Sequence, residues 1–184
     1  MGRFMNHKKW MAVIALAVTA LILTHLPVSE ADAAASASDF QTQGSTLVKY
    51  RGTEERVTIP DTVEVVGESA FENNQKVQFV VIPKSVKRLD AYVFWGCNNL
   101  EEVVLGKGLT AVDEYSFAGC TGLKQITIPE NIQSIDAQAF AGCVNLTDIY
   151  IPATVTGIAE DAFLNCDNVT IHADEGSVAA QFAQ

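Results

Sequence analysis

Phenylalanine recurs every 23 residues over most of this sequence. The repeated positions are Phe71, Phe94, Phe117, Phe140 and Phe163, and the same step separates Cys97, Cys120, Cys143 and Cys166, as well as Pro60 from Pro83 and Pro129 from Pro152. A fixed period of this length is the signature of a solenoid, in which one short unit is copied along an axis and each copy packs on its neighbours. The spacing therefore predicts a repeat protein in which the Phe and Cys columns form one continuous core.

The residues of a single copy predict its local structure. In the copy over residues 123–145, Ile126 and Ile128 alternate with Thr127, which is the period of two of a strand with one buried face. Pro129 ends that strand, because proline has no N–H for a further ladder hydrogen bond. The remainder of the copy is too short for a long helix and predicts irregular turns and single helical turns. One short strand per repeat should pair in parallel with the strand of the next.

Both ends of the array differ from its middle. Five repeats span residues 54–168. Before them, a strand and a turn predict a hairpin over residues 47–59 that covers the N-terminal edge, and residues 34–46, rich in Ala, Ser, Thr and Gln, predict a flexible leader. Residues 169–184 predict a C-terminal cap that contains a short helix from Ser177 to Phe182.

The first 33 residues have the pattern of a secretory signal peptide. Basic residues precede an apolar run of 14 residues, from Trp10 to Leu23, and small residues follow at Ala31 and Ala33. The run is shorter than the ~20 residues that a membrane-spanning helix needs, so a retained anchor is the weaker alternative. We expect cleavage after Ala33 and a protein that is secreted or displayed at the cell surface.

The charge balance narrows the choice of partner. The chain has 12 basic and 22 acidic residues and a net charge of −10. Nucleic-acid binding needs a concentrated positive surface, and anionic lipid head groups repel an acidic protein. We therefore expect no nucleic-acid partner and no membrane contact after cleavage. Solubility alone is a sufficient explanation of the acidity.

The repeat closely resembles a known family. The pattern Leu-x-x-Ile-x-Ile-Pro-x-x-Ile-x-x-Ile-x-x-x-Ala-Phe-x-x-Cys, complete in residues 123–143 and nearly so in 146–166, resembles the BspA-type (Treponema-type) leucine-rich repeat. The resemblance implies a right-handed coil with one short parallel strand per repeat, mostly β and turns. It also implies export to the bacterial surface and adhesion to host matrix proteins or to other cells, and it transfers no catalytic residue. Among the departures, Gly106 in place of proline is expected to loosen the third turn.

Two repeated columns, one of cysteines and one of aspartates, have alternative interpretations. Four cysteines in an exported chain suggest disulfides, but neighbours in register lie ~4.8 Å apart with parallel Cβ vectors, which does not suit a disulfide. We expect free, buried thiols, and no zinc site, since one column cannot direct four sulfurs at one centre. Asp90, Asp113 and Asp136 also recur, and a carboxylate column suggests calcium or, more simply, residues that begin turns. We favour turns, and we expect no metal or other cofactor.

The sequence gives little support for catalysis. After residue 33, His172 is the sole histidine, so no Ser-His or Cys-His pair is expected in the body of the domain. Adjacent acids such as Glu101 and Glu102 are more simply explained as solvated surface. We therefore predict that the protein is not an enzyme and has no catalytic residues.

Two surfaces are candidates for binding. The first is the outward strand column, with the neighbouring Phe79, and consists of Thr58, Phe79, Val81, Val104, Thr127 and Tyr150. The second is an aromatic cluster on the turn side, consisting of Tyr92, Trp95 and Tyr115, near Lys84, Lys87 and Arg88 in the sequence. Val and Thr also simply suit strands, and packing between coils also explains the aromatic residues.

The function most consistent with this pattern is non-enzymatic protein binding or adhesion outside the cell. The partner would be a host matrix protein or another cell-surface protein. One alternative is a structural spacer without a dedicated ligand. Another is a glycan-binding module that uses the aromatic cluster.

Overall fold

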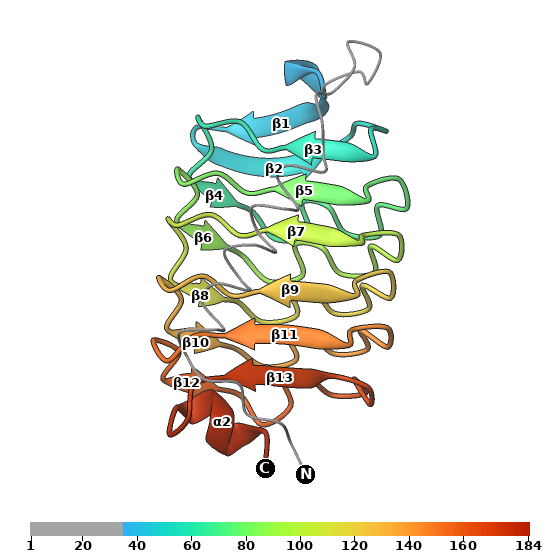
Figure 1. The fold of residues 1–184 in the computed structure, drawn as a ribbon. Coiled ribbons are helices and arrows are strands. Elements are labelled where there is room, and N and C mark those ends of the chain that lie inside the picture. The colour runs from blue at the N-terminus through green and yellow to red at the C-terminus, as the bar shows by residue number, and fades with distance from the viewer. Residues whose placement is uncertain (1–34) are drawn as a thin grey trace, which may run out of the picture. The chain divides into compact units, whose positions relative to one another are not determined.

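The computed structural model describes residues 35–184, in which stacked coils of about 23 residues each present a strand on one common side (Figure 1). These strands are β3 (Arg56–Thr58), β5 (Phe79–Val81), β7 (Glu102–Val104), β9 (Gln125–Thr127), β11 (Asp148–Ile151) and β13 (Thr170–Ala173). They pair in parallel and in register, in the orders β3-β5-β7 and β9-β11-β13. We call their outward side the front face. The predicted solenoid of leucine-rich-repeat type is confirmed.

Each coil from β3 to β11 also has a second strand, which the sequence did not predict. The second strands are β4 (Val65–Val66), β6 (Arg88–Leu89), β8 (Ala111–Val112), β10 (Ser134–Ile135) and β12 (Gly157–Ile158). They pair in parallel with the equivalent strands of neighbouring coils. The structure therefore confirms the predicted strand of each repeat, and corrects the expectation of turns alone on the opposite side, where short strands lie among the turns. A strand of two residues contains only one alternation, so it leaves no detectable period.

The N-terminal end is covered by a hairpin that begins earlier than expected. Strand β1 (Phe40–Gln43) pairs antiparallel with β2 (Thr46–Tyr50), and a short 3-10 helix, η1 (Ala37–Asp39), precedes them. The prediction of a hairpin over 47–59 was wrong, because β3 pairs with β5 while β2 pairs in parallel with β4. The flexible leader over 34–46 was wrong for residues 37–46, which this hairpin and η1 include. The proposed signal peptide lies outside the described residues.

The C-terminal end has a short helix, α2 (Val178–Phe182), after β13. Ser177 caps the helix, because its hydroxyl accepts a hydrogen bond from the backbone N–H of Ala180 at 3.1 Å. The Phe182 ring lies 5.9 Å from the ring of Phe163. The helix therefore covers the last ring of the core column.

The core is a stack of aromatic rings along the solenoid. Successive ring centroids from Phe71 to Phe163 are 4.9, 5.3, 5.5 and 5.4 Å apart. Tyr50 extends the stack at 4.9 Å from Phe71, and Phe40 follows at 5.0 Å from Tyr50. The sequence period did not reveal these two members, because the hairpin residues depart from the 23-residue step.

The four cysteines lie beside this stack, free and buried. Each thiol donates a hydrogen bond to the carbonyl of a phenylalanine in the preceding coil. These bonds are Cys97 to Phe71 at 3.1 Å, Cys120 to Phe94 at 3.2 Å, Cys143 to Phe117 at 3.1 Å and Cys166 to Phe140 at 3.0 Å. The thiols therefore satisfy backbone carbonyls between coils, and burial raises the pKa of Cys97 to about 12.

Gly106 brings the third coil close to the second. A Cβ at this position would clash with the carbonyl oxygens of Ile82 and Pro83. The expectation that Gly106 loosens the turn was therefore wrong, since the missing side chain permits a closer approach. Between the third coil and the fourth, the Asn131 side chain donates a hydrogen bond to the carbonyl of Leu109. The front sheet is divided at the same place, between β7 and β9.

Candidate functional site

The front face brings together all six residues of the first candidate surface. Thr58, Val81, Val104, Thr127 and Tyr150 lie in one row across β3 to β11, and Phe79 lies two residues before Val81 on the same side of β5. Val104 is 44% exposed, which is high for a strand valine. The buried residues between them, such as Val80 and Val103, anchor the strands in the core. The row is therefore held on a rigid sheet.

Arg56 adds a cation at the N-terminal end of the front face. Its guanidinium lies 4.2 Å from the centroid of the Phe79 ring, within the range of a cation–π contact. The two residues face each other because Arg56 and Phe79 are register partners on β3 and β5. Sequence reasoning missed Arg56, although its 23-residue distance from Phe79 is a usable signal.

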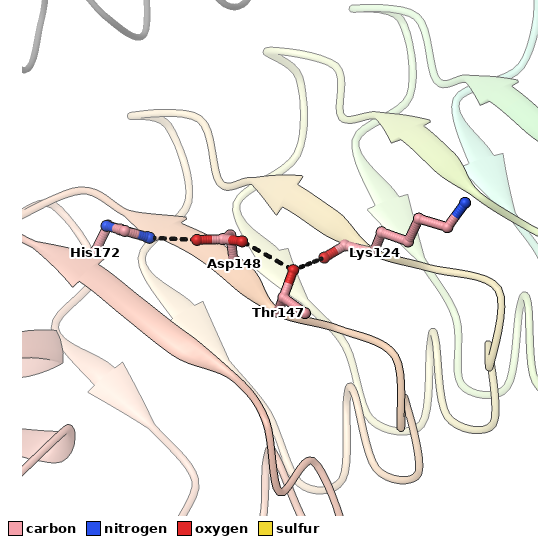
Figure 2. Close-up of polar contacts among 4 residues, drawn as sticks. All are labelled: Lys124, Thr147, Asp148 and His172. Atoms are coloured by element: carbon pink, nitrogen blue, oxygen red, sulfur yellow. Dashed lines mark hydrogen bonds and ion pairs between the residues drawn. The ribbon is translucent and has the colours of Figure 1, made fainter.

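At the C-terminal end, Tyr150 and His172 form an aromatic pair. Their ring centroids are 4.5 Å apart and the rings are nearly parallel, at 14°. His172 Nε2 also contacts Asp148 Oδ1 at 2.7 Å (Figure 2). This contact lowers the pKa of the Asp148 carboxyl. The sequence did not predict this group because β13 follows β11 at a step of 22 residues rather than 23.

The same group is not arranged for nucleophilic catalysis. Figure 2 shows that Asp148 lies between His172 and Thr147, whose hydroxyl is 2.8 Å from Asp148 Oδ2 and 3.1 Å from the carbonyl of Lys124. In a catalytic triad the imidazole must contact the hydroxyl so that it can accept the proton. Here His172 Nε2 contacts the opposite oxygen of the carboxylate, Asp148 Oδ1, so the carboxylate separates the imidazole from the Thr147 hydroxyl. The group therefore holds side chains in place on the front face.

A shallow depression crosses the division between β7 and β9. It is lined by Glu101, Glu102, Lys124, Gln125 and Thr147. Lys124 Nζ lies 3.6 Å from Glu101 Oε2, and both side chains are largely exposed, so this ion pair contributes little to stability. The depression is open, and all five residues that line it have polar or charged side chains. Its shape suits the rim of a protein interface better than an enclosed small-molecule site.

The carboxylates of Asp90, Asp113 and Asp136 lie close enough together to influence one another. Burial, and then the neighbouring Asp136 and Asp90, raise the pKa of Asp113 to about 6. The Arg88 side chain contacts Asp90 at 2.6 Å. Within residues 35–184, no group of three or more His, Cys, Asp or Glu side chains is placed to hold a metal ion.

The second candidate surface is also assembled by the fold, and we call Tyr92, Trp95 and Tyr115 the aromatic patch. Tyr92 stacks on Tyr115 at 4.7 Å and 9°, and Trp95 lies nearly perpendicular to Tyr92 at 6.5 Å and 89°. Trp95 is 41% exposed. Both tyrosines have left-handed backbone conformations, with φ of 61° and 54°. Ser69 and Gln138, at the same position of neighbouring coils, share this conformation, so it belongs to the repeat.

Charged residues of both signs lie near the aromatic patch. Lys84, Lys87 and Arg88 are near it in the sequence. Partial desolvation, then Tyr115 and the carboxylates of Glu114 and Glu68, raise the pKa of Tyr92. Arg88 is engaged by Asp90, and Lys87 Nζ donates to the carbonyl of Lys84. The electrostatic surrounding of the rings is therefore acidic.

None of the helices in residues 35–184 has the length and apolar character to cross a bilayer.

Comparison with known proteins identifies solved structures with the same fold. A leucine-rich cell surface protein from Faecalibacterium prausnitzii A2-165 is 34% identical over 75% of this chain, with a TM-score of 0.67. The leucine-rich repeat protein of T. pallidum is 26% identical over 76% of this chain, with a TM-score of 0.72. A protein from Bacteroides ovatus is 29% identical over 71% of the chain, with a TM-score of 0.62.

This chain spans 37%, 71% and 36% of those three structures, respectively. No curated protein matches it in sequence. The model of the BspA type leucine rich repeat region matches residues 49–170 in six copies, two-thirds of the chain. The chain belongs to the BspA-type leucine-rich repeat family.

Proposed function

We propose that this protein is exported to the bacterial surface and binds another protein there through the front face, without catalysis. The observation that carries the proposal is the outward row of valine, threonine and tyrosine side chains, with Phe79 beside it, on a sheet anchored in the core. Leucine-rich repeats generally act in protein–protein interaction, and the relative from F. prausnitzii is a cell surface protein. Adhesion to a host matrix protein or to another surface protein is the corresponding biological role.

The size of the front face sets the scale of the contact. Six strands spaced ~4.8 Å apart extend over ~24 Å, which suits one interface of roughly 800 Å² per partner. Arg56 on Phe79 and His172 on Tyr150 limit the motion of the two largest rings. Rings that are already ordered lose little conformational entropy on binding.

The test is binding by a Phe79→Ser, Tyr150→Ser double variant. Purified protein is measured against a panel of purified host matrix proteins by surface plasmon resonance. We expect the double variant to lose at least about tenfold in affinity for the partner, in the range of an interface hot spot. A matched control is Val48→Ser together with Leu164→Ser, since both side chains are nearly half-exposed and lie off the front face.

Unchanged affinity in the front-face variant, with the control also unchanged, would exclude this face. Circular dichroism and thermal unfolding of each variant show whether the fold is retained. A protein that binds no member of the panel and no surface protein of its own organism would support the structural-spacer alternative instead.

A further inference from the structure

The fold explains the backbone of the aromatic patch but not its rings. Ser69 and Gln138 occupy the position of Tyr92 and Tyr115 in neighbouring coils and have the same left-handed conformation, with φ of 58° and 52°. Four consecutive coils therefore share this conformation, and two of them have a small or flexible side chain there. Tyrosine is a costly choice for left-handed backbone. A role outside the fold is the simplest reason for two consecutive tyrosines.

Trp95 leads to the same conclusion. The equivalent positions in other coils are Glu72, Ala118, Ala141 and Leu164, so the column has no requirement for an aromatic residue. The Trp95 side chain is 41% exposed and packs edge-on against Tyr92. It fills no core position, because the buried ring of this coil is Phe94.

The charges beside the rings indicate what the aromatic patch attracts. Glu68 and Glu114 are both exposed, and they occupy the position of Ala91 in the coil before and in the coil after. Because Ala91 directly precedes Tyr92, the two glutamates lie on the two sides of Tyr92. The nearby cations are already engaged: Arg88 contacts Asp90 at 2.6 Å, and Lys49 Nζ donates to the carbonyl of Ser69 at 2.9 Å. Ring faces attract cations through their quadrupole, and flanking carboxylates add charge attraction.

We propose that the aromatic patch is a second binding site, which takes an arginine or lysine side chain from a basic segment of a partner protein. Tyr92, Tyr115 and Trp95 supply the ring surfaces, while Glu68 and Glu114 supply the complementary charge. The site lies in the turns between β6 and β7 and between β8 and β9, apart from the front-face row. It therefore does not depend on the front face being an interface.

Trp95 itself reports on the site. The chain has two tryptophans, so a full chain with Trp10→Phe leaves Trp95 as the sole tryptophan. The probe is a synthetic peptide of alternating Gly and Arg, titrated at low ionic strength while Trp95 fluorescence is followed. An acidic peptide of alternating Gly and Glu and a chito-oligosaccharide serve as comparison ligands. We expect a saturable change with the Arg peptide, weakened by added salt, and none with the other two ligands.

Two substitutions in the same background test the named residues. Tyr92→Ser introduces the residue found at the equivalent Ser69, so the backbone is accommodated, and affinity should fall about tenfold. Glu114→Gln should also weaken binding. The matched controls are Gln138→Ser and Glu160→Gln, which lie in the same two columns away from the rings. Both should leave affinity unchanged.

The proposal is overturned if the Arg peptide gives no saturable change, or if Tyr92→Ser binds it as well as the parent protein does. A saturable response to the oligosaccharide alone would overturn it in favour of a glycan site. The Phe79→Ser, Tyr150→Ser variant should bind the Arg peptide normally. Failure at the aromatic patch and failure at the front face are therefore separate results.

Discussion

At the scale of single residues, the ring stack runs through the core and joins each coil to the next. Phe117 is fully buried and has a ring on each side, at 5.3 and 5.5 Å. We expect Phe117→Ala to lower the free energy of unfolding by about 3 to 5 kcal/mol, because it removes a large buried side chain and leaves a cavity. Urea denaturation measures the loss.

Phe163→Ala is the comparison for this prediction. Phe163 is only partly buried and is covered on its outer side by Phe182 at a tilted 60°. Its replacement should cost less than that of Phe117. An equal or greater cost at Phe163 would show that the stack does not carry the stability in the way inferred here.

The residue columns could be predicted because the period is strict where coils stack on coils. Phe71 and Cys97 each recur at a 23-residue step, so their burial follows from the sequence. Tyr50 and Phe40 could not be found in this way, because they reach the same stack from a hairpin with its own geometry. The 23-residue step also makes Arg56 and Phe79 register partners, but the period alone does not specify that the guanidinium lies over the ring.

At the scale of elements, the aspartate column makes stability depend on pH. The pKa of Asp113 is about 6 in the fold against 3.8 for an ordinary aspartate, raised first by burial and then by Asp136 and Asp90. A raised pKa means that the folded protein binds the proton more tightly than the unfolded chain does. The contribution of Asp113 to stability is therefore fully present below about pH 4 and is lost as the pH rises to about 6.

Asp113→Asn should remove this dependence. At pH 7 we expect the variant to be more stable than the parent by on the order of 1 kcal/mol, once solvent screening of a half-buried group is allowed for. The measurement is thermal unfolding between pH 4 and 7.5. Asp61→Asn, at an exposed turn, is the matched control and should follow the parent curve. A parent protein that gains stability from Asp113 as the pH rises would contradict this assignment.

Gly106 leads to a prediction opposite to that of the repeat pattern. Four repeats have proline at this position, so restoring it would ordinarily be expected to stabilise the third coil. The structure leaves no room for a Cβ there, because the carbonyls of Ile82 and Pro83 lie against Gly106. We expect Gly106→Ala to cost about 1 to 3 kcal/mol, as overpacking does, and Gly106→Pro to cost more.

Gly157→Ala is the control for this pair. The nearest atom to a Cβ at Gly157 is the Ser134 Cβ at 3.9 Å, an ordinary contact, so its effect should be small. Denaturant unfolding of the three variants gives the comparison. A stabilised Gly106→Pro protein would mean that the third coil can move away from the second at no cost.

The elements themselves were predictable in proportion to their length. Front strands of three or four residues, four of which are followed by proline, leave a clear alternation, whereas β4 and its equivalents leave none. The hairpin was misplaced because residues 40–43 have a polar composition, in which only Phe40 is buried. Antiparallel pairing with β2 orders this segment, and pairing partners are not visible in local composition.

At the scale of the whole molecule, the front face and the aromatic patch follow from the same principle. A solenoid places equivalent positions in rows, so any outward column becomes a surface strip. The sequence could therefore identify both strips as candidates. It could not show that the charges around Tyr92 are acidic, because Arg88 is close in sequence but paired with Asp90 in space, while Glu68 and Glu114 approach from neighbouring coils.

The two ends should contribute unequally to the stability of the array. The N-terminal hairpin buries three large side chains, Phe40, Leu47 and Tyr50, whereas α2 fully buries only Ala179. Each large apolar side chain removed from water contributes roughly 1.5 to 3 kcal/mol, so deleting residues 1–51 should cost on the order of 5 kcal/mol. Deleting residues 177–184 should cost about 1 to 2 kcal/mol, mainly through exposure of Phe163.

Urea unfolding of the two truncated proteins measures the difference, with a chain that begins at residue 35 as the control for loss of the first segment. Coils that contact only their neighbours transmit the loss of a cap inward one interface at a time. Loss of the hairpin exposes Phe71 and the edge of β4, so unfolding should begin at that end. If deletion of α2 proved the more damaging, the C-terminal coils would have to be the weaker half of the array, in spite of the continuous ring stack.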